Sequence, residues 1–134
     1  MLNISSERAG VGGGVLIRAL EPLEGIALMQ RNRKATQLLD LTRGPGRLAA
    51  ALGIESSLDG LDLFRRGPLW LAELVRSKTA HQNNPADAPV AATVRIGITR
   101  AADRPFRFYE LGSPFVSGPK RLLLPPSGET AERR

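Results

Sequence analysis

The residues best suited to chemistry lie at positions 43–47, where glycine, proline and arginine are concentrated. Gly44-Pro45-Gly46 precedes an apolar run at positions 48–52, which predicts a helix that begins at this break in the chain. The first turn of a helix presents free backbone N–H groups that bind anions, and Arg43 and Arg47 add positive charge beside them. The sequence therefore predicts a contact with phosphate at this point.

No self-contained catalytic or metal site is visible in the sequence. The absence of cysteine excludes disulfide scaffolds, zinc ribbons, iron–sulfur sites and thiol nucleophiles. The single histidine, His81, excludes a multi-histidine metal centre, and it lies in the polar segment 76–89, which is predicted to be an exposed loop. The acidic residues are scattered, and the start of a predicted helix accounts for Glu21 and Glu24.

The composition is that of a globular protein with a basic surface. The 134 residues fit one domain, and 42% of them are hydrophobic. The net charge of +6 suggests a polyanionic partner, although a charge of this size can also serve general solubility. No apolar run approaches the roughly 18 residues that a membrane span needs, and positions 1–14 lack the features of a secretory signal. These observations predict a soluble cytoplasmic protein.

Two short apolar strands, at positions 1–6 and 15–17, predict a hairpin. The segment between them, positions 7–14, is rich in glycine and would form a wide loop. Its glycines lack the spacing of a dinucleotide-binding fingerprint and lead into a strand rather than a helix. A hairpin loop is therefore favoured over a phosphate cradle.

A helix is predicted to open at positions 21–24. Pro22 is tolerated in a first helical turn, and Ile26 and Met29, with Leu23, would share a face directed at the core. The basic residues at positions 30–34 suit the negative end of the helix dipole, and they suit a contact with nucleic acid equally well.

The rest of the chain alternates short elements with turns. We expect a short helix or turn at positions 38–41, a helix at 48–52 that stops at Gly53, and strands at 69–71, 90–98, 106–108 and 115–116. This order predicts the α+β class with a mostly antiparallel sheet, because strands and helices do not alternate regularly. Residues 1–118 are predicted to form one domain, and residues 119–134 a loose tail.

Six segments of the chain resemble the 3-methyladenine (alkyladenine) DNA glycosylase family. In order, they are Arg18-Ala19-Leu20-Glu21-Pro22-Leu23-Glu24-Gly25; Gly44-Pro45-Gly46-Arg47-Leu48 with Ala51-Leu52-Gly53-Ile54; Gly67-Pro68-Leu69-Trp70-Leu71; Arg95-Ile96-Gly97-Ile98; Arg107-Phe108-Tyr109; and Gly112-Ser113-Pro114-Phe115-Val116-Ser117. Each segment alone is modest evidence. Their common order over residues 3–117 makes the resemblance specific.

The resemblance implies a DNA repair enzyme of base excision. Such an enzyme flips an alkylated or deaminated purine out of double-stranded DNA and hydrolyses its N-glycosidic bond, because the reacting carbon cannot be reached inside the base stack. It implies a monomer that needs no metal or organic cofactor and that is associated with the nucleoid when bound to DNA. The fold implied is a curved antiparallel sheet with helices packed at one side.

Four residues match positions at the family's reaction site. Asn3 matches an asparagine that crowds the exocyclic amino group of guanine, although it could simply cap a strand end. Arg18 matches an arginine that helps to hold the attacking water; we expect it to be partly buried, with a structural salt bridge as the alternative role. The backbone carbonyl of Ile96 would accept a hydrogen bond from the same water. Leu16 matches the pocket wall, and core packing explains it almost as well.

Other residues match the family's contacts with the DNA backbone. Arg47 and Gly46 belong to the Gly-Pro-Gly helix start, and Gly97 would let the phosphate chain approach closely. Arg43 and Arg33 are further candidates that could equally be solvated charges.

The resemblance also has clear departures. The family's general-base glutamate, its duplex-wedging tyrosine and the aromatic rings that stack on the flipped base all precede the position of Asn3, where this sequence has only Met1 and Leu2. The segment between Ile98 and Pro105 is short and lacks the family's tryptophan. We therefore expect a chain that lacks amino-terminal strands and is inactive by itself. The alternative to a glycosylase is a catalytically dead DNA-binding fragment of the family.

Overall fold

The computed structural model describes residues 1–72, 89–118 and 123. The chain divides into two compact units, a first unit of Met1–Gln82 and a second unit of Asn83–Arg134. The described residues form three short α-helices and two two-stranded antiparallel sheets, which confirms the α+β class. None of these helices is long and apolar enough to cross a membrane. His81 and nearly all of the predicted tail lie outside the described residues, and the single 1–118 domain and the curved sheet stay predictions.

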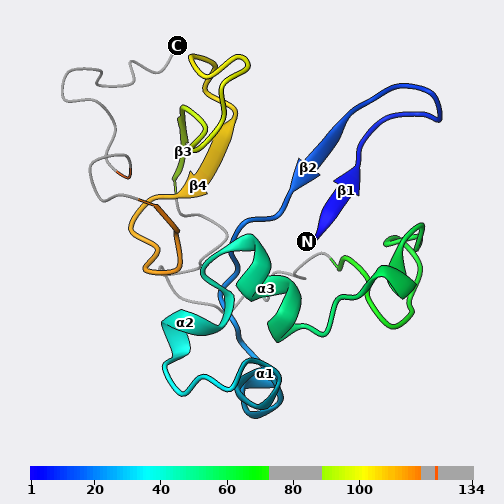
Figure 1. Cartoon of the computed structure of the whole chain (residues 1–134), viewed down its shortest axis with the longest axis vertical. Helices are drawn as coiled ribbons and strands as arrows, with labels where there is room; N and C mark the ends of the chain where they lie inside the picture. Colours follow the sequence, from blue (N-terminus) through cyan, green and yellow to red (C-terminus); the bar gives the residue numbers. More distant parts are fainter. Residues whose placement is uncertain (73–88, 119–122, 124–134) are drawn as a thin grey trace, which may run out of the picture. The chain divides into compact units, whose positions relative to one another are not determined.

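The predicted hairpin is confirmed in the first unit. Strand β1 (Asn3–Ser5) pairs antiparallel with β2 (Gly14–Leu16) (Figure 1). Asn3 lies opposite Leu16 in this pairing. The backbone N–H of Ile17 donates to the carbonyl of Leu2 at 3.0 Å, so pairing extends one residue beyond the strands. The glycine-rich segment between the strands forms the hairpin loop, as the sequence indicates.

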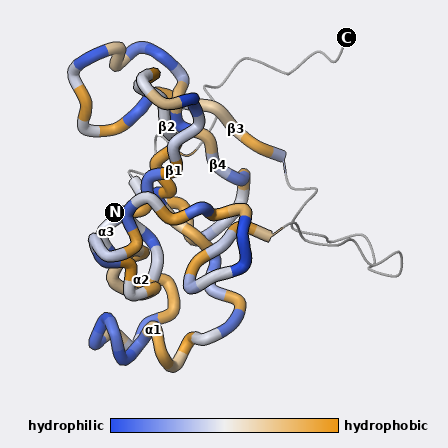
Figure 2. Tube along the Cα trace, turned by 90° about the vertical axis from the view of Figure 1, so that its right-hand side faces the viewer, coloured by the Kyte–Doolittle hydropathy of each residue, from blue (hydrophilic) through white to orange (hydrophobic). Residues whose placement is uncertain are grey.

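Helix α1 (Ile26–Arg33) begins later than the sequence predicts. Gly25 precedes it with φ of 69°, a left-handed conformation that a helix running through positions 21–24 could not contain. The predicted core face is only partly confirmed: Ile26 and Met29 are half-buried and Leu28 between them is exposed, but α1 has no fully buried residue and Leu23 is 71% exposed. The basic end is confirmed: the last turn of α1 is strongly hydrophilic (Figure 2).

Helices α2 (Leu38–Thr42) and α3 (Pro45–Ala51) supply the core of the first unit. The fully buried side chains of Leu41 and Leu48 lie at this core, and burying such side chains contributes roughly 1.5–3 kcal/mol each. Helix α3 ends at Ala51 and is capped by Leu52, and Gly53 follows with φ of 65°, the predicted left-handed stop. The hydroxyl of Thr42 donates to the carbonyl of Leu20, which ties the segment after the hairpin to α2.

Between Gly53 and residue 72, where the described part of the first unit ends, the chain is irregular apart from the 3-10 turn η1 (Ser56–Leu58). The strand predicted at positions 69–71 was wrong. The N–H of Leu71 donates to the carbonyl of Leu63 at 2.7 Å, which closes a loop and supplies no ladder. Trp70 and Leu71 are 45% and 48% exposed, so their apolar character alone did not create a buried strand.

The second unit contains strand β3 (Val90–Thr93) paired antiparallel with β4 (Arg107–Glu110). The strand predicted at positions 90–98 stops at Thr93, because a turn that places Gly97 at φ of 73° follows. The strand predicted at positions 115–116 was wrong: Phe115 is buried in a turn, with no strand partner among the described residues.

The two-residue period around β4 is confirmed, but its buried face is polar. Arg107 and Tyr109 are buried, whereas Phe108, which lies between them, is 68% exposed. Phe106 lies before the strand and is 54% exposed. Hydrophobicity alone would have assigned these faces the other way round.

Candidate functional site

The hairpin brings two of the predicted pocket residues, Asn3 and Leu16, face to face. They are direct cross-strand partners, so their side chains point to the same face of the sheet. Hydrogen-bonded and non-hydrogen-bonded pairs alternate along an antiparallel ladder, and the neighbouring Leu2–Ile17 pair is bonded. The Asn3–Leu16 pair is therefore the non-bonded kind, in which side chains lie closest. Asn3 is exposed and Leu16 is half-buried, and their role in a pocket stays a prediction.

Arg18 follows this pair two residues beyond the end of β2. It is exposed, so the expectation that it is partly buried among Leu16 and Ile17 was wrong: the segment leaves the sheet before its side chain can be covered. The ion pairs among the described residues do not include Arg18. Its guanidinium, with five N–H donors in a planar fork, is open to a partner from outside this part of the chain.

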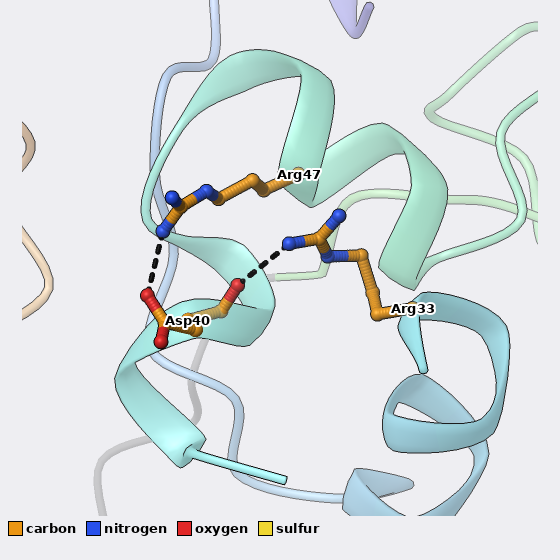
Figure 3. Close-up of polar contacts among 3 residues, drawn as sticks. All are labelled: Arg33, Asp40 and Arg47. Carbon is orange, nitrogen blue, oxygen red and sulfur yellow. Dashed lines mark hydrogen bonds and ion pairs between the residues drawn. The ribbon is translucent and has the colours of Figure 1, made fainter. Parts of the chain in front are cut away.

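A cluster of three charged side chains connects the three helices of the first unit. Figure 3 shows the guanidinium groups of Arg33 and Arg47 both reaching Asp40. A nitrogen of Arg47 lies 2.7 Å from a carboxylate oxygen of Asp40, and Arg33 donates to the backbone carbonyl of Asp40 at 3.1 Å. Arg33 ends α1, Asp40 lies in α2 and Arg47 lies in α3. Arg33 and Arg47 carry two positive charges and Asp40 carries one negative charge, so the cluster has one net positive charge that can attract an anion.

The cluster stays accessible to a ligand. The side chains of Arg47 and Asp40 are 46% and 48% exposed. Gly46 is exposed with open space where a side chain would lie, so a phosphate chain could approach α3 there. Arg43 is half-buried at the end of α2. Among the predicted backbone contacts, Arg47, Gly46 and Arg43 thus lie together around the α2–α3 break.

Sequence reasoning missed the role of Asp40. Asp40 and Arg47 are seven residues apart and lie on two different helices, so the spacing that reveals ion pairs within one helix does not apply. The sequence indicated this ion pair only through the position of the Asp40 carboxylate, shortly before the arginine-containing break at positions 43–47.

The predicted residues of the second unit, Ile96 and Gly97, share one turn. Gly97 is exposed, in a left-handed conformation with open space around its Cα, which permits close approach of another chain. The side chain of Ile96 packs closely against Gly118. If Gly118 carried a Cβ atom, that atom would lie only 2.7 Å from the Cδ1 atom of Ile96. Because Arg18 belongs to the first unit, the water site that needs both Arg18 and Ile96 stays a prediction.

Arg107 is a second residue that the sequence did not single out by role. It is 6% exposed, and it donates to the hydroxyl of Thr93 at 3.0 Å and to the carbonyl of Ser117 at 2.7 Å. Its guanidinium also lies 4.6 Å from the centre of the Tyr109 ring. It therefore joins the end of β3, strand β4 and the segment at residues 117–118 against which Ile96 packs. In the sequence, only the two-residue alternation expected for β4 could have indicated that Arg107 is buried.

Comparison with known proteins connects the chain with one family. Residues 1–114 match the Methylpurine-DNA glycosylase (MPG) family. This chain belongs to that family, which confirms the resemblance drawn from the six sequence segments.

Three relatives share the name "Putative 3-methyladenine DNA glycosylase". The chain is 58% identical over 122 residues to the one from Mesorhizobium japonicum, covering 91% of this chain and 54% of the relative. It is 44% identical over 133 residues to the one from Paraburkholderia phytofirmans, covering 99% and 58%. It is 48% identical over 120 residues to the one from Granulibacter bethesdensis, covering 88% and 54%. The chain thus spans about half the length of the relatives that it matches.

Proposed function

We propose that this chain forms the DNA-contacting part and one pocket wall of a 3-methyladenine DNA glycosylase that acts in base-excision repair. The observation that carries the proposal is the direct pairing of Asn3 with Leu16 across the hairpin. Membership of the methylpurine glycosylase family supplies the reaction class, hydrolysis of the N-glycosidic bond of a damaged purine. The partner is double-stranded DNA, bound by a monomer without a cofactor, and the complete fold is a curved antiparallel sheet.

Each pocket residue has a distinct part in this mechanism. A flipped purine lies against the Asn3–Leu16 face, where the Asn3 amide crowds the exocyclic amino group that marks guanine. Leu16 offers an apolar surface to the base. The Arg18 guanidinium donates to the attacking water, and the carbonyl of Ile96 accepts from that water. A damaged base reaches the pocket more easily because its removal from the stack costs less than that of a paired normal base.

The phosphate backbone is held by positive charge around the α2–α3 break. Arg47 and Arg43 supply the charge, and Gly46 leaves room for the chain of phosphates. Gly97 gives the same freedom of approach in the second unit. These contacts do not read sequence, which suits an enzyme that must scan all of the DNA.

Two substitutions at one ion pair are expected to change DNA affinity in opposite directions. Arg47→Glu removes a phosphate contact and adds a repulsive charge, so it should weaken binding to a plain duplex about tenfold at about 50 mM salt. Asp40→Asn releases Arg47 from its 2.7 Å partner and should strengthen binding about twofold to threefold. Fluorescence anisotropy with a labelled duplex measures both.

Thermal unfolding provides the control for this pair of variants. The pair is about half exposed, so its loss changes stability by no more than about 1 kcal/mol. If both variants bind the duplex as the wild type does, Arg47 has no role in DNA binding.

The exposure of Arg18 supports the second candidate function, a DNA-binding fragment without catalysis. The two candidate functions are separated by comparing the chain's affinity for a duplex that contains one hypoxanthine with its affinity for an undamaged duplex. A glycosylase pocket favours the damaged duplex, whereas a binding fragment holds both equally. Asn3→Ala and Leu16→Ala should reduce such a preference without changing affinity for undamaged DNA.

A further inference from the structure

A basic loop of the second unit, residues 94–106, presents an aromatic ring to the surface. It contains Arg95, Arg100 and Arg104 against one acidic residue, Asp103. Phe106 at its end is 54% exposed. A phenylalanine left this exposed gains little from burial, so packing does not account for its place in a loop that carries three arginines.

The loop is held in a defined shape by its own first arginine. Arg95 donates to the backbone carbonyls of Arg100 at 3.0 Å and Ala101 at 3.2 Å. The N–H of Arg104 donates to the carbonyl of Ala101 at 3.3 Å, and Ala101 itself has φ of 48°. Arg95 is thus occupied in closing the loop, whereas the exposed Arg100 and Arg104 have no side-chain ion pair among the described residues.

The ring of Phe106 lies within a positive field. The guanidinium of Arg95 lies 5.7 Å from the ring centre and that of Arg104 lies 5.8 Å from it. Aromatic rings interleaved with arginines form the surface on which proteins stack nucleic-acid bases while neutralising phosphates. A neutral or basic protein partner would find no charge complementarity here.

We propose that residues 94–106 form a second DNA-binding surface, in which Arg100 and Arg104 bind phosphates and Phe106 stacks on an unpaired base. This inference rests on the proposed function, because it takes DNA as the partner. Gly97 lies in the same loop, exposed and open to close approach, so the surface extends a contact already assigned there. The surface suits DNA from which a base has been unstacked, because a paired base offers no free face to the ring.

Binding to two labelled duplexes tests the proposal, one fully paired and one with a single unpaired base. Arg100→Glu/Arg104→Glu should weaken binding to both about tenfold or more and lower the slope of log affinity against log salt by about two. Phe106→Leu should weaken binding only to the duplex with the unpaired base, by about fivefold or more. Arg100→Gln/Arg104→Gln repeats the first test with less perturbation of folding.

Matched controls isolate each part of the surface. Phe108→Leu alters a neighbouring ring that is 68% exposed, and Arg8→Glu reverses an exposed charge in the hairpin loop; neither should change affinity by more than about twofold. If Phe106→Leu behaves like Phe108→Leu, the stacking role is overturned. If the charge variants bind normally while Arg47→Glu is weakened, this inference fails and the proposed function stands. If the wild-type chain binds neither duplex, both fail.

Discussion

Replacement of Arg107 by methionine is expected to destabilise the second unit by about 3 kcal/mol. Arg107 is 6% exposed and donates to Ser117 and Thr93, so its removal takes this partner from a half-buried carbonyl and a half-buried hydroxyl. Each such unsatisfied group costs roughly 1–3 kcal/mol. Methionine fills much of the volume of arginine and therefore tests the polar contacts more than the packing.

Hydrogen exchange measured by mass spectrometry localises this effect. Amides of β3 and β4 should exchange about a hundredfold faster in Arg107→Met if they exchange through opening of this unit, while those of α3 stay unchanged. Arg107→Lys keeps the positive charge but loses the planar guanidinium, so the exchange rates of these amides should lie between those of Arg107→Met and those of the wild type. Arg104→Met, at an exposed arginine nearby, is the control. Equal exchange in Arg107→Met and Arg104→Met would contradict the role given to Arg107.

The 134-residue chain by itself is expected to release no measurable hypoxanthine or alkyladenine from duplex DNA under single-turnover conditions. Arg18 can hold a water but cannot deprotonate it, because a guanidinium stays protonated in proteins. None of the six segments that resemble the family carries the residue expected to act as its general base, and general-base catalysis contributes on the order of 10²–10⁴-fold. A flipped base that has no aromatic stacking partner is held less tightly, by roughly 1–3 kcal/mol per ring.

Two variants show what any observed excision would mean. Activity that persists at the wild-type rate in Arg18→Gln does not depend on the proposed water-holding role of Arg18. Activity that disappears in Arg18→Gln and also in Glu21→Gln would contradict the expectation and identify Glu21 as a base. Glu21 is open to such a role, because it lies before α1 and does not begin that helix.

The parts of the fold that the sequence predicted depend on local rules. The hairpin followed from two short apolar runs around glycines, and the start of α3 followed from Gly44-Pro45-Gly46. The start of α1 was misjudged because Pro22 and two glutamates are a valid helix opening, and only the left-handed conformation of Gly25 excludes it. The strand expected at positions 69–71 failed because strands need partners that no local pattern supplies.

The residues of the candidate site also fall into those that local sequence rules could predict and those that they could not. Asn3, Leu16 and Arg18 were found from a resemblance along the chain, and their cross-strand pairing follows from the register of a short hairpin. The contacts of Asp40 and Arg107 depend instead on side chains that meet between different elements. No spacing rule links such residues, and a sequence without its fold leaves them unassigned.

The most direct test of the central claim, that this chain contacts DNA through its arginines, is a salt titration of duplex binding. Affinity for a labelled undamaged duplex is measured between about 50 and 200 mM salt. If Arg43, Arg47, Arg100 and Arg104 contact phosphates, the logarithm of the affinity should fall against the logarithm of salt with a slope of about −3 to −4. Binding that is absent at the lowest salt, or that does not change with salt, would contradict the account.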